Sequence, residues 1–166
     1  MERPRYRIAL EKEDFKFSAA HFTLFLDREA ELLHGHNYRV RVEVAGSTLD
    51  ELGLLVDLDA AKRKIRALCA ALDSRMLLPE PGGPLAIARR EAGIEVRGRE
   101  RRYLFPEQDV VFLPMVNISI ELLAEHLWQA LAADFRAEQS GTIEEMGVAV
   151  EETAGQKCVR WGRIGE

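Results

Sequence analysis

Only two cysteines, Cys69 and Cys158, occur among the 166 residues. Two thiols cannot form the disulfide framework of a small secreted protein, so we expect a reducing compartment. No apolar run approaches the roughly 20 residues that a membrane-spanning helix needs. The first residues are charged and lead directly into a strand-like segment, which does not match a signal peptide. These absences predict a cytoplasmic protein.

Basic residues are also too few to give the chain a positive charge. It has 23 Lys and Arg against 28 Asp and Glu, for a formal net charge of −5 at pH 7. Such a chain is a poor candidate for binding nucleic acid or an anionic membrane as its main partner. The length suits one domain with its own core, and no repeats are visible. We therefore expect a single domain over residues 1–166.

Histidine is rare, yet three of the four copies lie within sixteen residues. His34 and His36 flank Gly35 in an extended run, and the two-residue period of a strand directs both imidazoles to one face. His21, on a neighbouring strand facing the same way, would supply a third nitrogen. Three protein ligands leave one position for water or substrate, the layout of a catalytic zinc site. The alternative is three unrelated histidines. His126 falls within a predicted helix and is not expected to be a ligand.

Hydrophobic periodicity predicts both strands and helices along the chain. His36 is in register with the apolar positions Tyr38 to Val44, which places the metal site on the inward face of its strand. Asp57 and Ser119 stand where helix N-caps are expected. The predicted strands are 6–10, 15–21, 36–45, a short one ending at 57, 110–114 and 143–152, and the predicted helices are 58–72 and 120–135.

The order of these segments indicates an α+β fold, with a four-stranded antiparallel sheet and two helices on one face. Such a sheet leaves its edges open, so we expect assembly into an oligomer. Residues 79–108 are interpreted as an insert, because prolines and glycines at 79–84 break the preceding pattern. Within the insert, 94–96 and 103–105 suggest a small hairpin.

The segments at 17–22 and 33–38, which hold the three histidines, resemble the zinc-binding signature of the 6-pyruvoyltetrahydropterin synthase family. The resemblance runs over almost the whole chain, through 119–121 to a final strand at 148–153. This family includes the bacterial 6-carboxytetrahydropterin synthases of queuosine biosynthesis. Membership implies the tunnelling fold, in which trimers close a barrel of strands and stack in pairs as a hexamer. It also implies active sites between subunits, each with one zinc.

The resemblance further implies a set of site residues. His21, His34 and His36 match the zinc ligands. Glu152 matches the residue that anchors the pterin, since a carboxylate accepts two parallel hydrogen bonds from the ring. Without the family, Glu152 is equally well interpreted as a surface acid at a strand end. The expected substrate-binding residues are Glu152, Thr153, Ser119 and Glu121.

One departure from the family concerns its catalytic cysteine. Family synthases carry a Cys four residues before the first His of the His-Gly-His motif, and here that position is Ala30. Glu31 follows it and resembles the subgroup in which a Glu replaces the Cys and the product becomes 6-hydroxymethyl-7,8-dihydropterin. Glu29 is a second candidate for this base. Either could instead be a solvated loop acid.

A second departure concerns the family's proton relay, an Asp-His pair. The chain keeps Asp73 but has Ser74 in place of the His. A serine does not hold a proton near neutral pH, so this half of the acid–base machinery is weakened or supplied by another group. We retain Asp73 as a candidate catalytic residue.

Together these features lead to the hypothesis of a zinc-dependent lyase that acts on 7,8-dihydroneopterin or its triphosphate. Glu31, with a pKa raised by partial burial, would remove the 2′-hydroxyl proton, and the C1′–C2′ bond would break. The alternatives are 6-pyruvoyl- or 6-carboxy-tetrahydropterin synthesis, a non-catalytic pterin- or metal-binding relative, and a purely structural zinc site. Candidate cations for a triphosphate are Arg28, Arg39 and Arg41.

Overall fold

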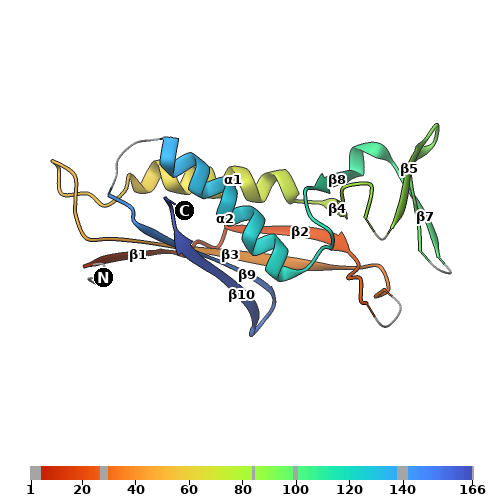
Figure 1. Cartoon of the computed structure of the whole chain (residues 1–166), viewed down its shortest axis with the longest axis horizontal. Helices are drawn as coiled ribbons and strands as arrows, with labels where there is room; N and C mark the ends of the chain where they lie inside the picture. The colour runs from red at the N-terminus through yellow and green to blue at the C-terminus, as the bar shows by residue number, and fades with distance from the viewer. Residues whose placement is uncertain (1–4, 27–29, 84, 99–100, 138–141, 166) are drawn as a thin grey trace.

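The computed structural model describes residues 5–26, 30–83, 85–98, 101–137 and 142–165. A large sheet lies under two helices, which both cover the same face, and a small three-stranded sheet stands at one end of the molecule (Figure 1). In the described part of the chain, no helix combines the length and apolar composition that a membrane crossing requires.

The large sheet has seven strands, so the predicted four-stranded antiparallel sheet is wrong in size and in direction. The order is β10-β9-β3-β2-β4-β8, with β1 paired to β3. The pairs β2–β4 and β4–β8 are parallel, and the others are antiparallel. The strands are β1 (Tyr6–Leu10), β2 (Lys16–His21), β3 (His34–Gly46), β4 (Arg75–Pro79), β8 (Val110–Leu113), β9 (Glu145–Thr153) and β10 (Gln156–Arg163).

The strand that sequence reasoning missed, β4, has no alternating pattern. Its residues 76–79 are all buried, as is usual for a parallel strand covered on both sides. The short strand expected to end at 57 is absent from the described residues. There the chain turns instead, and the Asp50 carboxylate accepts hydrogen bonds from the amides of Leu52 and Leu54.

The two helices are α1 (Leu58–Leu72) and α2 (Ile120–Ala137), close to their predicted bounds. The Asp57 carboxylate caps α1 by accepting hydrogen bonds from the amides of Asp59 and Ala60, at 2.8 and 3.1 Å. The Ser119 hydroxyl accepts one from the amide of Leu122 at 3.4 Å. Both predicted caps are therefore confirmed. A single 3₁₀ turn, η1 (Glu107–Asp109), precedes β8.

Alternation along β3 directs its apolar side chains toward the helices. Tyr38, Val40, Val42 and Val44 are all buried in the main core. The opposite face of β3 is polar, as the sequence pattern predicted. The helices contribute Ala61, Ile65, Cys69, Leu72, Leu123, Leu127, Trp128, Leu131 and Phe135 to this core.

The small sheet consists of β5 (Ala86–Arg90), β6 (Gly93–Arg97) and β7 (Arg102–Phe105). The predicted hairpin of β6 and β7 is confirmed, and β5 is an addition. Ile94 and Val96 on one face of β6 are fully buried in a second apolar cluster that joins this sheet to the rest of the chain. The cluster also contains Phe22, Met76, Leu78 and Leu85.

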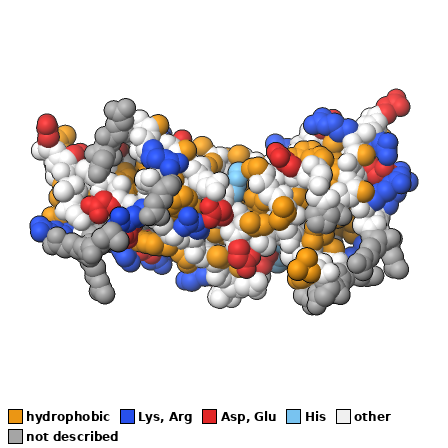
Figure 2. Space-filling view, viewed as in Figure 1, with side chains coloured by type: hydrophobic (Ala, Val, Ile, Leu, Met, Phe, Trp, Pro, Cys, Tyr) orange, Lys and Arg blue, Asp and Glu red, His pale blue; other side chains and the backbone are white. Residues whose placement is uncertain are grey.

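The other face of the small sheet holds a buried carboxylate among arginines. Glu95 is 1% exposed, and Arg90, Arg97 and Arg102 all donate hydrogen bonds to it. The hydrogen bonds from Arg97, Arg90 and Arg102 outweigh the effect of burial and lower the pKa of Glu95 to about 2. Figure 2 shows Lys and Arg side chains gathered at this end of the molecule.

This lowered pKa predicts an acid-sensitive contribution to stability. A carboxyl with a folded pKa of about 2 and an unfolded pKa of about 4.3 stabilises the fold above the unfolded value and loses that contribution as pH falls. Urea unfolding of the natural chain and Glu95→Gln should therefore differ most above about pH 5, and the difference should shrink toward pH 2. A difference that stays constant over this range would show that the charge of Glu95 is not responsible.

Candidate metal centre

The register of β2 and β3 brings the three histidines together. His21 lies directly opposite His34, and Ala19 lies opposite His36. All three imidazoles share the face of Tyr38, toward the helices. The ring centroids are 4.7 Å apart for His21 and His34, 4.7 Å for His34 and His36, and 5.3 Å for His21 and His36. The arrangement is the one that the strand period predicted.

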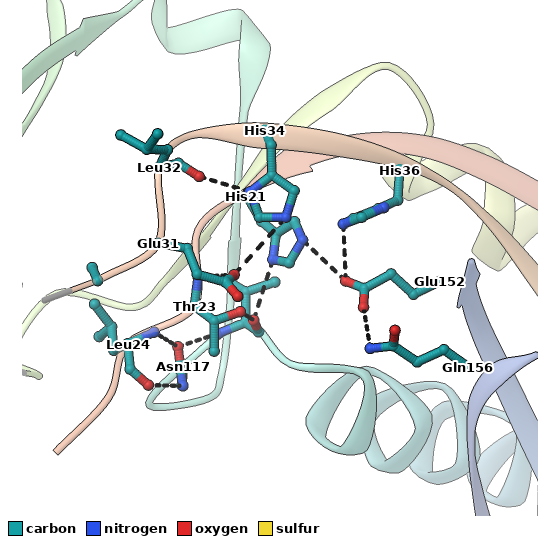
Figure 3. A network of polar contacts seen from close by, with 12 residues as sticks. His21, Thr23, Leu24, Glu31, Leu32, His34, His36, Asn117, Glu152 and Gln156 are labelled. Carbon is teal, nitrogen blue, oxygen red and sulfur yellow. Dashed lines mark hydrogen bonds and ion pairs between the residues drawn. The ribbon is translucent and has the colours of Figure 1, made fainter. Parts of the chain in front are cut away.

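A carboxylate from β9 joins this cluster. One potential ligand atom from each of His21, His34, His36 and Glu152 lies within 4.8 Å of the others. Glu152 Oε1 is 3.2 Å from Nε2 of His21 and 3.2 Å from Nε2 of His36 (Figure 3). The sequence singled out Glu152 as a pterin anchor but did not place it beside the histidines.

Strand pairing and hydrogen bonds explain the position of Glu152. Arg39 pairs with Glu151, so the next residue of β9 comes beside Tyr38 on the inner face. The Tyr38 hydroxyl donates to Glu152 Oε1 at 3.3 Å, and Gln156 Nε2 donates to Oε2 at 3.1 Å. Burial, together with the Glu152 charge, raises the pKa of the Tyr38 phenol, which keeps this donor protonated.

Backbone carbonyls fix the orientation of two imidazoles. Nδ1 of His34 lies 2.7 Å from the carbonyl oxygen of Leu32, and Nδ1 of His21 lies 3.3 Å from that of Ile118. A carbonyl oxygen only accepts, so these contacts assign the proton to Nδ1. The Nε2 lone pairs are then directed toward the centre of the cluster, as in histidine ligands supported by an outer hydrogen bond.

The state of His21 tests whether the cluster suits a metal ion. Its side chain is 1% exposed, and among the described residues its Nε2 has no hydrogen-bond partner. Burial lowers the pKa of His21, and the nearby His34 lowers it further. Both effects favour the neutral form of His21 that a metal ligand requires. A buried nitrogen lone pair without a donor, beside two further imidazoles and a carboxylate, fits a divalent cation such as Zn²⁺.

Glu31 approaches the cluster from the loop between β2 and β3. Its Oε2 is 3.9 Å from Nε2 of His34. The same oxygen accepts a hydrogen bond from the Thr23 amide at 3.2 Å, and the Glu31 amide donates to the Thr23 carbonyl at 3.0 Å. The sequence therefore singled out an acid that the fold does bring to the histidines. Arg28 and Glu29 lie outside the described residues.

The expected rise in the pKa of Glu31 is wrong. Burial acts to raise it, but the side chain is only partly enclosed. The hydrogen bonds from Thr23, with smaller contributions from the nearby His34 and His21, outweigh burial, and the net effect lowers the pKa. Glu31 is therefore ionised at neutral pH.

A set of backbone contacts supports the loop that carries Glu31. The Thr23 hydroxyl donates to the Ile118 carbonyl at 3.3 Å, the same oxygen that faces His21. Asn117 donates to the Leu24 carbonyl at 3.0 Å and accepts from the Leu24 amide at 2.9 Å. Sequence reasoning missed Thr23, Asn117 and Ile118, because carbonyl contacts between distant loops leave no periodic signal.

Asp73 does not reach the histidines within one copy of the chain. It is the C-cap of α1, and its carboxylate accepts hydrogen bonds from the Ser18 amide at 2.7 Å and the Ser74 hydroxyl at 3.3 Å. The Ser18 hydroxyl bonds Asn37, on the opposite face of the sheet from His36. These contacts fasten the end of α1 to β2, and a catalytic role for Asp73 stays a prediction.

The remaining predicted site residues lie on three different elements. Ser119 caps α2, and Glu121 is exposed in the first turn of that helix. The Thr153 hydroxyl donates to Gln156 at 3.4 Å, beside Glu152. Arg39 is exposed on the outer face of β3. Arg41 is already paired with Glu11 and Glu43, at 2.8 and 2.9 Å.

Comparison with known proteins places this geometry in a family. Residues 9–163 match the family model described as 6-pyruvoyl tetrahydropterin synthase. The chain belongs to this family. Its members are enzymes of pterin biosynthesis, and the resemblance that the histidine motifs suggested is confirmed.

Two archaeal relatives illustrate the sequence similarity. The putative 6-carboxy-5,6,7,8-tetrahydropterin synthase of Methanocaldococcus jannaschii is 25% identical over 146 residues, covering 87% of this chain and 89% of the relative. The probable 6-carboxy-5,6,7,8-tetrahydropterin synthase of Halobacterium salinarum is 41% identical over 78 residues, covering 47% and 48%.

Among solved structures, Plasmodium vivax 6-pyruvoyltetrahydropterin synthase is similar over 95% of this chain and 98% of its own. The TM-score is 0.88 and the identity 27%. Two structures of that enzyme are described as catalytic-residue mutants, in which a glutamate is replaced by alanine or by cysteine.

Proposed function

We propose that the chain is a metal-dependent pterin synthase that acts on the side chain of 7,8-dihydroneopterin or its triphosphate. The observation that carries this is the convergence of three Nε2 atoms and two carboxylates, those of Glu152 and Glu31, in a chain of this family. The names of the relatives favour 6-pyruvoyl- or 6-carboxy-tetrahydropterin synthesis over the C1′–C2′ cleavage that we expected from the sequence.

The proposed ligands of Zn²⁺ are His21, His34 and His36. Bound there, the ion supplies Lewis-acid polarisation of substrate oxygens. The protein's own part is to orient these imidazoles. The carbonyls of Leu32 and Ile118 do this for His34 and His21 by accepting hydrogen bonds from Nδ1–H, which leaves each Nε2 directed at the ion.

Glu31 is the proposed general base. Its carboxylate is 3.9 Å from Nε2 of His34, so a hydroxyl bound at the cluster comes within reach of a proton transfer. The lowered pKa keeps this oxygen free of a proton at neutral pH, at the cost of weaker basicity. The paired backbone bonds with Thr23 hold the carboxylate on the side of the cluster away from Glu152 (Figure 3).

Glu152 is the proposed pterin anchor. Tyr38 and Gln156 each donate a hydrogen bond to one of its oxygens, and these two bonds fix the plane of the carboxylate. Oε1 faces the histidines, so a ring held by this carboxylate would have its side chain next to the metal ligands. Thr153, Ser119 and Glu121 remain proposed substrate contacts.

A second candidate is C1′–C2′ cleavage to 6-hydroxymethyl-7,8-dihydropterin. Ala30 occupies the position where the family carries its catalytic Cys, and Glu31 beside it reaches the cluster. Neither Cys69 nor Cys158 belongs to the group of potential ligands. The Plasmodium vivax enzyme, whose described catalytic residue is also a glutamate, lends support to a carboxylate in this role.

We also propose a homo-oligomer, either a trimer or a hexamer. Strands β8 and β10 end the large sheet, and each leaves one edge without a partner strand in the described part of the chain. Within a single copy Asp73 is bonded to Ser18 and Ser74. A catalytic Asp73 would therefore have to act on the histidine cluster of a neighbouring copy.

Product identification tests the proposed function. Zinc-loaded protein is incubated with 7,8-dihydroneopterin and, separately, with its triphosphate, and the products are identified by chromatography and mass spectrometry. A 6-pyruvoyl or 6-carboxy product supports the synthase reaction. A 6-hydroxymethyl product selects C1′–C2′ cleavage. Tight pterin binding without any product over a long incubation overturns both reactions and indicates a non-catalytic pterin-binding protein.

A further inference from the structure

We propose that the small sheet β5–β7 positions the loop that carries Glu31, and that Arg101 is its positioning residue. The inference rests on the proposed function of Glu31. Arg101 lies just before β7, in the connection from β6, and its Nη1 donates to the carbonyl oxygens of Ala30 at 3.2 Å and Glu31 at 3.1 Å. One charged donor thus bonds to the two peptide groups that flank the Glu31 Cα atom.

A backbone hydrogen bond ties Arg101 to the residue that follows β6. The Gly98 amide donates to the Arg101 carbonyl at 2.9 Å, and this bond continues the antiparallel ladder of β6 and β7. The guanidinium therefore projects from a hydrogen-bonded sheet end. A rigid base of this kind suits a residue that orients another one.

An aromatic contact holds the other end of the same loop. Phe22, the residue after His21, stacks on Tyr103 of β7 with ring centroids 5.7 Å apart and planes 19° apart. Tyr103 in turn stacks on Phe105 at 5.8 Å. Leu24 and Ala30 pack against the same apolar cluster. The loop thus touches the small sheet near both of its ends.

These contacts matter because the described part of the loop, 22–26 and 30–33, contains no helix or strand to hold it. The Glu31 carboxylate is directed toward His34 only while the backbone at 30 and 31 keeps its place. A displacement of about 1 Å in a reacting group can cost about 100-fold in rate. Arg101 is bonded directly to the Glu31 backbone, so we expect its effect on turnover to run through Glu31.

The test compares Arg101→Met, Arg101→Lys and Arg89→Met. Arg89 belongs to the same small sheet and pairs with the exposed Glu107, so its replacement removes the same guanidinium charge from a side chain that is bonded to η1 and, among the described residues, has no hydrogen bond to the loop. We expect Arg101→Met to lower kcat about 10- to 100-fold with KM and zinc content unchanged. Arg101→Lys should recover part of this loss, and Arg89→Met should leave kcat as it was.

A double-mutant cycle separates positioning from general stabilisation. If Arg101 acts through Glu31, Arg101→Met should add nothing to the loss caused by Glu31→Gln. An equal fold-loss in both backgrounds would overturn the proposal, as would a fall in thermal stability with kcat retained.

Hydrogen exchange gives a readout that does not require turnover. The Glu31 amide is bonded to the Thr23 carbonyl, so its exchange rate reports how often this hydrogen bond is broken. Its exchange should quicken in Arg101→Met and stay unchanged in Arg89→Met. Unchanged exchange in Arg101→Met overturns the positioning role whatever the reaction is. Faster exchange, with no product from the natural chain, upholds the contact and places the failure in the proposed function.

Discussion

Glu31→Gln is expected to lower turnover about 10²- to 10⁴-fold, the range of a lost general base. The amide is isosteric with the carboxylate and still accepts the hydrogen bond from the Thr23 amide, so the loop should keep its shape. What it loses is the ability to take a proton. Because Glu31 contacts His34 only at 3.9 Å, zinc content should stay the same. The measurement is kcat on the substrate that yields product, together with metal analysis of the purified variant.

Glu29→Gln is the matched control, since the sequence left Glu29 as a second candidate and the change is chemically identical. It should leave kcat within a few-fold of the natural chain. Loss of turnover in Glu29→Gln with turnover retained in Glu31→Gln would move the base to Glu29. Retained turnover in both would remove loop carboxylates from the reaction altogether.

The parts of the site that could be predicted are those governed by strand periodicity. His34, His36 and Tyr38 share a face because they are two residues apart, and the burial of Tyr38 follows from the same alternation. The placement of Glu152 beside Tyr38 needed the pairing of β3 with β9, which joins residues more than a hundred positions apart. The pattern of apolar and polar residues along the sequence does not indicate this register between β3 and β9.

The parts that could not be predicted depend on unpatterned backbone contacts. β4 is short and buried along nearly its whole length, so it showed neither a helical nor a strand period. The direction of the Glu31 pKa was wrong for a related reason. Burial was foreseeable for an acid beside a metal site, but the Thr23 amide that outweighs it comes from the far side of the loop. The carbonyl of Ile118 and the side chain of Asn117 escaped notice in the same way.

His34→Ala is expected to abolish stoichiometric zinc binding and, with it, turnover. Replacing a group that merely supports a ligand costs about 10- to 100-fold in metal affinity, and removing one of three nitrogen ligands should cost more. His34 is at the partly exposed side of the cluster, with 36% of its side chain accessible, so its loss should disturb the core less than that of His21. Zinc affinity is measured by competition with a chromophoric chelator, and the fold is checked by circular dichroism.

His126→Ala is the control, because His126 lies on α2 outside the group of potential ligands. A second measurement uses linkage. A ligand that binds only the folded chain stabilises it by about 2.7 kcal/mol at a free concentration of 100 Kd. Added Zn²⁺ should therefore raise the Tm of the natural chain and of His126→Ala but not that of His34→Ala. An equal rise in all three proteins would place the ion elsewhere. No rise in any of them would mean that the cluster holds no metal, and that the buried Nε2 of His21 is left unsatisfied for another reason.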